Sequence, residues 1–142
     1  MKLITKNTDY AIRALVNVAS RQEQEYISVA SIAAQENIPV AYLRRIAATL
    51  IKKGYFMTKE GKTGGVKLVR EPDTIHLIDV IRSFQGELEL STCMFRKKLC
   101  DNRSTCVLRC RLKSIERKLI QEFEEITIQC LLDDAGTKRR LT

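Results

Sequence analysis

The sequence predicts a mainly α-helical fold with a small β-wing, in which a winged helix-turn-helix domain is followed by a long C-terminal dimerisation helix. Three observations carry this prediction. Apolar residues recur at helical spacing in three segments before residue 54, and a glycine-rich turn then separates two short apolar runs. From residue 104 to 132, apolar residues return about every 3.5 positions, which is typical of a helix that packs along a seam.

Length and composition are those of a small soluble protein. The 142 residues suffice for one compact domain, or for one domain with a dimerising extension. Hydrophobic residues make up 44% of the chain and charged residues 30%, so a packed core and a polar surface can coexist. No apolar run approaches the roughly 20 residues that cross a bilayer, and the first residues lack the pattern of a secretory signal. We therefore expect a cytoplasmic protein with no membrane partner, whose thiols stay reduced.

The net charge of +8 is concentrated in the first half of the chain. Residues 1–70 hold 12 Lys and Arg against 5 Asp and Glu, whereas residues 71–142 hold 13 against 12. A positive charge confined to one half favours a surface that binds a polyanion such as nucleic acid. A merely solvated basic surface is the alternative that charge alone leaves open.

Two helices are expected to support a helix-turn-helix. Thr8 is placed to cap a first helix that runs to Ser20, with Asp9 in its first turn. Ser28 is expected to cap a second helix. That helix must end before Pro39, because a proline excludes the residue before it from helical backbone angles.

A third helix begins directly after Pro39 and is the candidate recognition helix. It ends at Gly54, a residue type that commonly terminates helices. Its outward positions are small or basic, namely Ala41, Arg44, Arg45, Ala48 and Lys52. Such a surface suits a helix that enters the major groove of DNA, whereas an ordinary amphipathic helix with solvated arginines is the alternative.

A β-hairpin is expected next, in the position of a wing. The runs 55–58 and 66–69 read as strands, and the turn between them is rich in glycine and lysine. Lys59, Lys62 and Lys67 can reach phosphates, and the glycines permit close approach of the backbone. A nucleotide-binding loop is disfavoured, because the turn lacks the spacing of a phosphate-binding loop and no helix follows it directly.

The second half is expected to hold a short helix and a long one. The short helix covers residues 75–84, and we assign no function to its His76, the only histidine of the chain. The long helix runs from about residue 104 to 132, with Ile126 and Cys130 in its apolar seam. Dimerisation through this helix is the economical way to bury the seam, since helix-turn-helix proteins usually bind two-fold-related half-sites.

Four of the five cysteines form a candidate metal or redox site. Cys93, Cys100, Cys106 and Cys110 fall within 18 residues, while Cys130 lies apart. Thiolates suit iron–sulfur clusters, and nearby Lys and Arg residues favour the thiolate form. A structural zinc site and a reversible disulfide switch are the alternatives that the spacing leaves open, although paired CxxC motifs typical of zinc sites are missing.

The ordered motifs of the chain resemble those of the IscR/NsrR-type winged-helix transcription regulators, the Rrf-two family. The resemblance lies in residues 1–3 and 8–15, the Ile-Pro and Tyr-Leu pairs at 38–39 and 42–43, residues 50–55, the wing end 61–66, and 75–81. The three cysteines at 93, 100 and 106 fall where the cluster-binding branch has its own. Each motif is short, but their order and spacing together are specific.

This resemblance implies a homodimeric promoter-binding regulator, chiefly a repressor, that binds a pseudo-palindromic operator in double-stranded DNA. It implies a 2Fe–2S or 4Fe–4S cluster on Cys93, Cys100 and Cys106 that senses iron–sulfur status, redox state or nitric oxide. Asp9 of the partner subunit is the first choice for a further ligand, with Cys110 second. The residues expected to contact DNA are Ser28, Tyr42, Arg44, Arg45, Lys59, Lys62 and Thr63.

The sequence departs from the family pattern at the loop and the wing. The first cysteine gap is one residue longer than usual, and the histidine that completes the cluster in one branch is absent. Glu60 replaces the usual arginine of the wing, and Arg44 stands where an acidic residue is common. We therefore expect an operator sequence unlike those of familiar members.

The expected division of the chain has four parts. These are a DNA-binding domain at 1–86, a cluster-binding loop at 87–106, a dimerisation helix at 107–132 and a flexible tail at 133–142. The competing hypothesis is a cluster-free winged-helix regulator that is switched by thiol oxidation or by a partner protein. An enzyme is not expected, because no Cys–His pairing, carboxylate pair or nucleotide loop is apparent.

Overall fold

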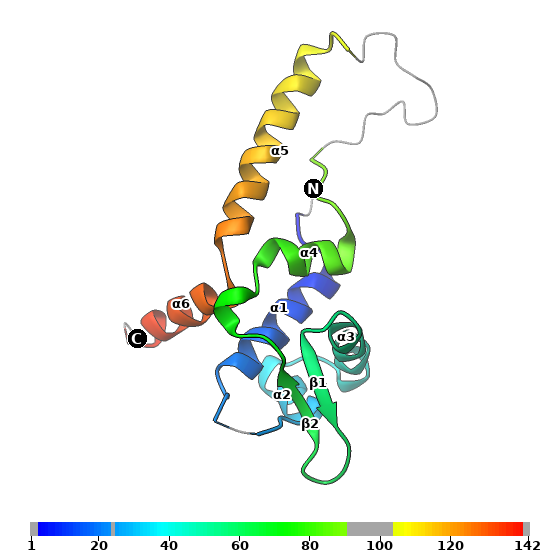
Figure 1. The fold of residues 1–142 in the computed structure, drawn as a ribbon, viewed down its shortest axis with the longest axis vertical. Helices are drawn as coiled ribbons and strands as arrows, with labels where there is room; N and C mark the ends of the chain where they lie inside the picture. Colours follow the sequence, from blue (N-terminus) through cyan, green and yellow to red (C-terminus); the bar gives the residue numbers. More distant parts are fainter. Residues whose placement is uncertain (1–2, 24, 91–103, 141–142) are drawn as a thin grey trace.

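The computed structural model describes residues 3–23, 25–90 and 104–140, with side chains as far as residue 136. The elements follow in the order α1 (Lys6–Ala19), α2 (Val29–Glu36), α3 (Val40–Lys52), β1 (Phe56–Lys59), β2 (Gly65–Leu68), a 3₁₀ turn η1 (Pro72–Thr74), α4 (Leu77–Gln85), α5 (Val107–Glu125) and α6 (Ile128–Arg140). Helices α1 to α3 and the hairpin form one body, and α5 extends away from it (Figure 1). Helix α6 packs on α1, and α4 lies against both α1 and α5.

Helix α1 begins three residues earlier than the sequence suggested. Thr5, not Thr8, is the N-cap, and its side-chain oxygen accepts a hydrogen bond from the amide of Thr8. Thr8 is fully buried inside the first turn, where its hydroxyl donates to Oε1 of Gln85 on α4 at 2.8 Å. The placement of the cap at Thr8 was therefore wrong, because a partner 77 residues away recruits this hydroxyl for a tertiary contact.

Helices α2 and α3 form the predicted helix-turn-helix. Ser28 caps α2 by accepting a hydrogen bond from the amide of Ser31 (3.1 Å), as predicted. Asn37 then takes the left-handed conformation, with φ of 54°, and reverses the chain. Pro39 is the N-cap of α3, so α3 begins one residue later, also as predicted.

The wing is an antiparallel hairpin in which Phe56 pairs with Leu68 and Lys59 with Gly65. A single bridge joins it to the residue that precedes the N-cap of α2, since Ile27 and Val66 exchange both backbone hydrogen bonds at 2.8–2.9 Å. Gly65 permits this approach, because a Cβ there would lie 2.2 Å from the carbonyl oxygen of Ile27. The lack of a side chain at the start of β2 thus lets the Ile27–Val66 bridge hold the wing against the helix-turn-helix.

The main core surrounds α1, whose inward residues contact every other helix of the body. Leu15, Ile32, Leu43, Leu50 and Phe56 are among its fully buried side chains. A second apolar cluster lies between α4 and the last turns of α5, where Leu77, Ile78 and Ile81 pack against Phe123. The last turns of α5 are therefore packed against α4.

The prediction of one long helix from residue 104 to 132 was wrong. The chain forms two helices, separated at Ile126 and Thr127, and Ile126 is extended with φ of −85° and ψ of 123°. The break is caused by backbone pairing with an earlier segment: the amide of Leu77 donates to Ile126, and the amide of Ile128 donates to Ile75. Tertiary hydrogen bonds have replaced helical ones at these positions.

Two further details differ from the sequence-based expectation. Cys130 is exposed and does not belong to a buried seam. Residues 133–140 continue α6 as a helix, where a frayed tail was expected.

The division into DNA-binding, cluster-binding and dimerising parts stays a prediction. Among the described residues, no helix has the length and apolar character needed to cross a membrane.

Candidate nucleic-acid interface and cysteine site

The positions of α3 that were predicted to face outward are exposed in the structure. Its buried residues are Leu43, Ile46, Ala47 and Leu50, which leaves Arg44, Arg45, Ala48 and Lys52 exposed on the other side. Among the described residues, neither Arg44 nor Arg45 forms an ion pair with a carboxylate. Two unpaired guanidinium groups on an outward helix are free to bind phosphates or base edges.

A buried polar network that the sequence did not reveal orients α2 on α1. Asn17 is 6% exposed and donates to the side chains of Gln35 and Glu36 at the end of α2. Arg21 donates to Oδ1 of Asn17 and to Oγ of Ser31 (2.8 Å). Partial burial lowers the pKa of Arg21 from its usual value, while the charge of Glu36 opposes that shift. The network fixes the position of α2 and hence the angle at which α3 is presented.

The wing carries the other predicted DNA contacts. Lys62 and Thr63 are exposed at its tip, and Lys62 has no carboxylate partner within the described ranges. Lys59 lies further back, 3.9 Å from a carboxylate oxygen of Glu25 and 5.5 Å above the ring of Tyr26. The tip of the wing therefore offers an unpaired cation, whereas Lys59 is partly neutralised.

Ser28 and Tyr42 lie at the starts of α2 and α3. The hydroxyl of Ser28 accepts a hydrogen bond in capping α2, and its contact with DNA stays a prediction. Tyr42 is half-buried in the first turn of α3, where its ring contacts α1. Cζ of Arg45 lies 5.0 Å from the centroid of the Tyr42 ring, so Tyr42 adjoins the exposed arginines of α3.

Two residues of the predicted cysteine site, Cys93 and Cys100, lie outside the described residues. Cys106 is half-buried at the N-cap of α5, and Cys110 is exposed one turn later; both are free thiols. The amide of Cys110 donates to the carbonyl of Cys106 (3.2 Å), which places the two residues on one side of the helix. Two neighbouring sulfur donors are of the kind that iron–sulfur clusters use.

Asp9 and the two described cysteines lie on different helices, α1 and α5. Asp9 is on α1 within the body, where it pairs with Arg13 at 3.0 Å. The N-terminal end of α5 stands far from α1 (Figure 1). Within the described ranges, no group of three or more His, Cys, Asp or Glu side chains could hold a metal ion. The described part of one subunit therefore does not bring Asp9 together with Cys106 and Cys110 in a metal site, and a ligand from the partner subunit stays a prediction.

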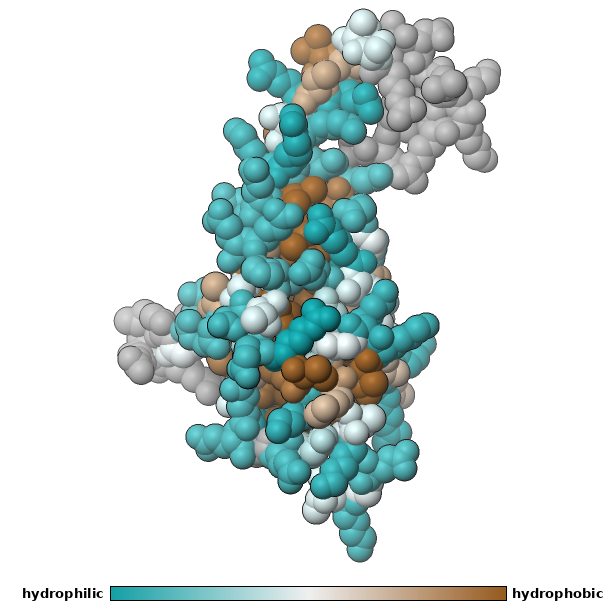
Figure 2. Space-filling model, viewed as in Figure 1, coloured by the Kyte–Doolittle hydropathy of each residue, from teal (hydrophilic) through white to brown (hydrophobic). Residues whose placement is uncertain are grey.

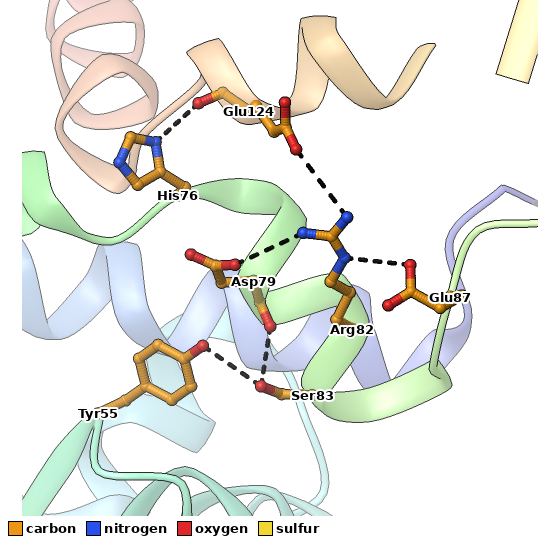
Figure 3. Close-up of polar contacts among 7 residues, drawn as sticks. All are labelled: Tyr55, His76, Asp79, Arg82, Ser83, Glu87 and Glu124. Atoms are coloured by element: carbon orange, nitrogen blue, oxygen red, sulfur yellow. Dashed lines mark hydrogen bonds and ion pairs between the residues drawn. The ribbon is translucent and has the colours of Figure 1, made fainter. Parts of the chain in front are cut away.

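Arg82 joins α4 to α5 and to the segment that leads toward the cysteines (Figure 3). Its Nε lies 3.2 Å from a carboxylate oxygen of Glu87, and its two Nη atoms lie 3.9 Å from Asp79 and from Glu124. The amide of Leu90 is held in turn by the carboxylate of Glu116 on α5 (3.0 Å). Residues 87–90 are therefore attached to both helices.

His76 and Ser83 extend this junction in two directions (Figure 3). Nδ1 of His76 donates to the carbonyl oxygen of Glu124 at 2.7 Å, which satisfies a carbonyl near the end of α5. Ser83 donates to the carbonyl of Asp79 and shares a 3.3 Å hydrogen bond with the hydroxyl of Tyr55, just before β1. The histidine to which the sequence assigned no function thus stabilises the α4–α5 junction.

Cys130 is a second place where thiol chemistry is available. The hydroxyl of Thr127 donates to its sulfur at 3.2 Å and lowers the pKa of the thiol. A lower pKa increases the thiolate fraction near neutral pH, and the thiolate is the reactive form. The position on the exposed side of α6 could not be predicted without knowing that the helix breaks at residue 126.

Comparison with known proteins identifies the kind of molecule. A family model described as "Rrf2: Iron-dependent Transcriptional regulator" matches residues 4–134. The chain is 30% identical over 139 residues to the HTH-type transcriptional regulator NsrR of Geobacillus kaustophilus, with 97% of this chain and 95% of the relative covered. It is also 30% identical over 136 residues to NsrR of Bacillus licheniformis, with 94% and 91% covered.

Solved structures confirm the predicted winged-helix fold. CymR, the global cysteine regulator of B. subtilis, matches with a TM-score of 0.76 and 22% identity, over 94% of this chain and 98% of that one. IscR of T. potens matches with a TM-score of 0.75 and 24% identity, over 95% and 88%. At these identities the likeness establishes the fold alone.

Replacing Arg82 should weaken the α4–α5 junction more than the loss of a simple surface ion pair. We expect Arg82→Gln to lower the free energy of unfolding by about 1 kcal/mol at low salt, since one partly exposed guanidinium is shared by three carboxylates. Arg13→Gln, which removes a single exposed i,i+4 pair, should cost about 0.3–0.5 kcal/mol. Urea unfolding at fixed protein concentration, with and without added salt, measures both; equal losses would show that the three-carboxylate arrangement contributes nothing extra.

Proposed function

The chain belongs to the Rrf2 family of transcriptional regulators, and on that premise we propose that it is a homodimeric repressor whose operator affinity is set by an iron–sulfur cluster. Members of this family are transcriptional regulators and not enzymes, and the same holds for this chain. The observation that carries the DNA-binding part is the pair of exposed, unpaired arginines on α3, the second helix of the helix-turn-helix.

Recognition of DNA follows from where the cations lie. Arg44 and Arg45 project from the outward side of α3, the element that enters the major groove in proteins of this architecture. Contacts with the backbone of the duplex are assigned to the wing, which is supported by the exposure of Lys62 and Thr63 at its tip; Lys59 is partly neutralised. We assign base contacts to Arg44 and phosphate contacts to Arg45 and the wing.

Dimerisation is supported by the exposed apolar side of α5. None of its residues is buried, and Leu108 and Ile115 are 68% and 55% exposed. Figure 2 shows apolar side chains along this helix between its charged ones. A long helix with an unburied apolar seam is stabilised by a second copy, and a dimer presents two recognition helices to a pseudo-palindromic operator.

The cluster is assigned to Cys93, Cys100 and Cys106, with the partner subunit's Asp9 as first choice for the remaining position and Cys110 as second. The described donors support this assignment, because Cys106 and Cys110 are free thiols at the outer end of the proposed dimer helix. When bound, the cluster supplies sensitivity to oxidants, nitric oxide and iron–sulfur supply. A 2Fe–2S and a 4Fe–4S cluster are both compatible with these ligands.

The chain's own residues can relay a change near the cysteines to the DNA-binding body. Residues 87–90 are held by Arg82 on α4 and by Glu116 on α5, so a rearrangement of the 87–106 loop acts on both helices. Helix α4 in turn shares a hydrogen bond with Tyr55 at the start of the wing. A tenfold to hundredfold change in affinity needs only about 1.4–2.8 kcal/mol of such coupling.

A cluster-free regulator is the second candidate, and a specific observation favours it. Cys130 is an exposed free thiol whose pKa is lowered by Thr127, which suits a redox-sensitive cysteine. The fold of this chain is also that of CymR, the global cysteine regulator of B. subtilis. In this alternative, oxidation of thiols or docking of a partner protein would control DNA binding.

The dimer is tested by placing a charge on the α5 seam. Ile115→Glu should raise the dimer dissociation constant at least tenfold, because burial of an isoleucine contributes roughly 1.5–3 kcal/mol. Lys113→Glu, which alters charge at an exposed position of the same helix, should leave the dimer intact. Sedimentation equilibrium measures both; a wild-type protein that is monomeric at micromolar concentration would contradict the proposal.

Sequence recognition is tested on an operator selected by the wild-type protein from a random duplex pool. Arg44→Ala should reduce the preference for the operator over a scrambled duplex, by about 1–3 kcal/mol, because a base contact is lost. Lys62→Ala should weaken both duplexes by similar factors, because phosphates carry no sequence information. Unchanged discrimination by Arg44→Ala in titrations at constant salt would refute this role for Arg44.

The cluster is tested by anaerobic purification followed by visible absorption and by iron and sulfide analysis. Wild type should be coloured and contain iron and sulfide, Cys106→Ala should lose both, and Cys130→Ala should match wild type. Asp9→Ala should shorten the lifetime of the cluster more than Cys110→Ala, and unaltered stability in both would exclude both as ligands. A colourless, iron-free wild type that binds the operator and responds to oxidant would establish the second candidate instead.

A further inference from the structure

Two cations and two tyrosines are gathered where the start of α1 meets the start of α3. The rings of Tyr10 and Tyr42 meet edge to face, with centroids 5.4 Å apart and planes at 85°. Nζ of Lys6 lies 5.4 Å from the centroid of Tyr10 and 5.6 Å from that of Tyr42, and Cζ of Arg45 lies 5.0 Å from that of Tyr42. With Asn7, which accepts a hydrogen bond from the Tyr42 hydroxyl (2.5 Å), these residues form what we call the Tyr42 cluster.

The Tyr42 cluster concentrates positive charge without neutralising it. Lys6 and Arg45 contact the same aromatic ring, and neither forms an ion pair with a carboxylate among the described residues. The rings attract the cations through their negative faces but carry no net charge. Both cations are exposed, so water reduces their mutual repulsion, and the attraction of a bound anion to each of them would offset it.

The cluster also holds a hydrogen-bond donor with no partner. Since Oδ1 of Asn7 accepts from Tyr42, the amide nitrogen of the same side chain remains, and within the described ranges it makes no hydrogen bond. Ammonium, guanidinium and amide groups are the side-chain donors that proteins use on the phosphates of DNA. Their common site adjoins Arg44, the residue assigned to a base contact.

We propose that the Tyr42 cluster binds one backbone phosphate of the operator, with Lys6, Asn7 and Arg45 as its ligands. This inference rests on the proposed function and extends the DNA-binding surface from α3 to α1. Tyr10 and Tyr42 act as positioning residues, because their rings hold the two cations on one side of the α1–α3 contact. The bound phosphate would fix the angle at which α3 enters the groove.

A purely structural role for the cluster makes a different prediction. If Lys6 only packs α1 against α3, its loss alters stability and leaves the salt dependence of DNA binding unchanged. If Lys6 binds a phosphate, its loss reduces the number of counterions released on binding. The slope of log affinity against log salt separates the two roles, since each phosphate contact contributes about 0.9 to it.

The experiment uses the full-length protein, its selected operator and a scrambled duplex of equal length, with fluorescence anisotropy between 50 and 300 mM KCl. Lys6→Gln should weaken both duplexes about tenfold and reduce the salt slope by roughly 0.9 for each bound subunit. Lys6→Arg should retain most of the affinity and the slope. Lys118→Gln, which removes an exposed lysine from α5, is the matched control and should match wild type.

Two results would overturn the proposal. One is a Lys6→Gln protein with wild-type affinity and slope; the other is a lowered melting temperature together with an unchanged slope. Failure of the proposed function itself looks different, because the wild-type protein would then show no preference for any selected duplex. A wild type that discriminates while Lys6→Gln behaves identically to it therefore refutes the phosphate site alone.

Discussion

The architecture depends on a short backbone pairing between residues 75–77 and 126–128. The amide of Leu77 donates to the carbonyl of Ile126 at 2.8 Å, and that of Ile128 donates to Ile75 at 3.0 Å. Ile75 and Ile128 are almost wholly buried, so water cannot easily replace these hydrogen bonds, and breaking them would leave polar groups unpaired in the core. Because the pairing interrupts the helical sequence, it sets the direction in which α5 leaves the body and places α6 against α1.

Helix α4 connects this pairing with the wing. Arg82 joins it to Glu124 on α5, and Ser83 joins it to Tyr55 before β1. Its apolar side chains also pack against Phe123, so a displacement of α5 cannot leave α4 unchanged. Contiguous packing and hydrogen bonding of this kind are a physical route for coupling between two sites. Helix α4 thus links the proposed dimer helix α5 to the wing of the proposed DNA-binding surface by direct contacts.

The sequence predicted those features whose causes are local. The cap at Ser28, the break before Pro39 and the glycine-rich hairpin each depend on residues within a few positions, and the structure confirms them. The break at residue 126 could not be predicted, because the backbone that causes it lies about 50 residues earlier in the chain. Likewise, Arg21 lies just after α1, and only the fold brings it to Ser31 of α2. Of the candidate site, the exposed face of α3 was predictable from helical spacing, whereas the contact of Lys6 with Tyr42 was not.

The structure also shows which of the chain's cations are available to a partner. Arg82 and Arg13 are matched by carboxylates, so they contribute little field beyond their own neighbourhood. Arg44, Arg45 and Lys62 have no such partners among the described residues, and all three are exposed on α3 or on the wing. An excess of unpaired charge does not stabilise the fold, and its mutual repulsion is a small cost. That arrangement is favourable when a polyanion releases its counterions on binding, which is why we read the basic first half of the chain as a DNA-binding surface and not as a solvated one.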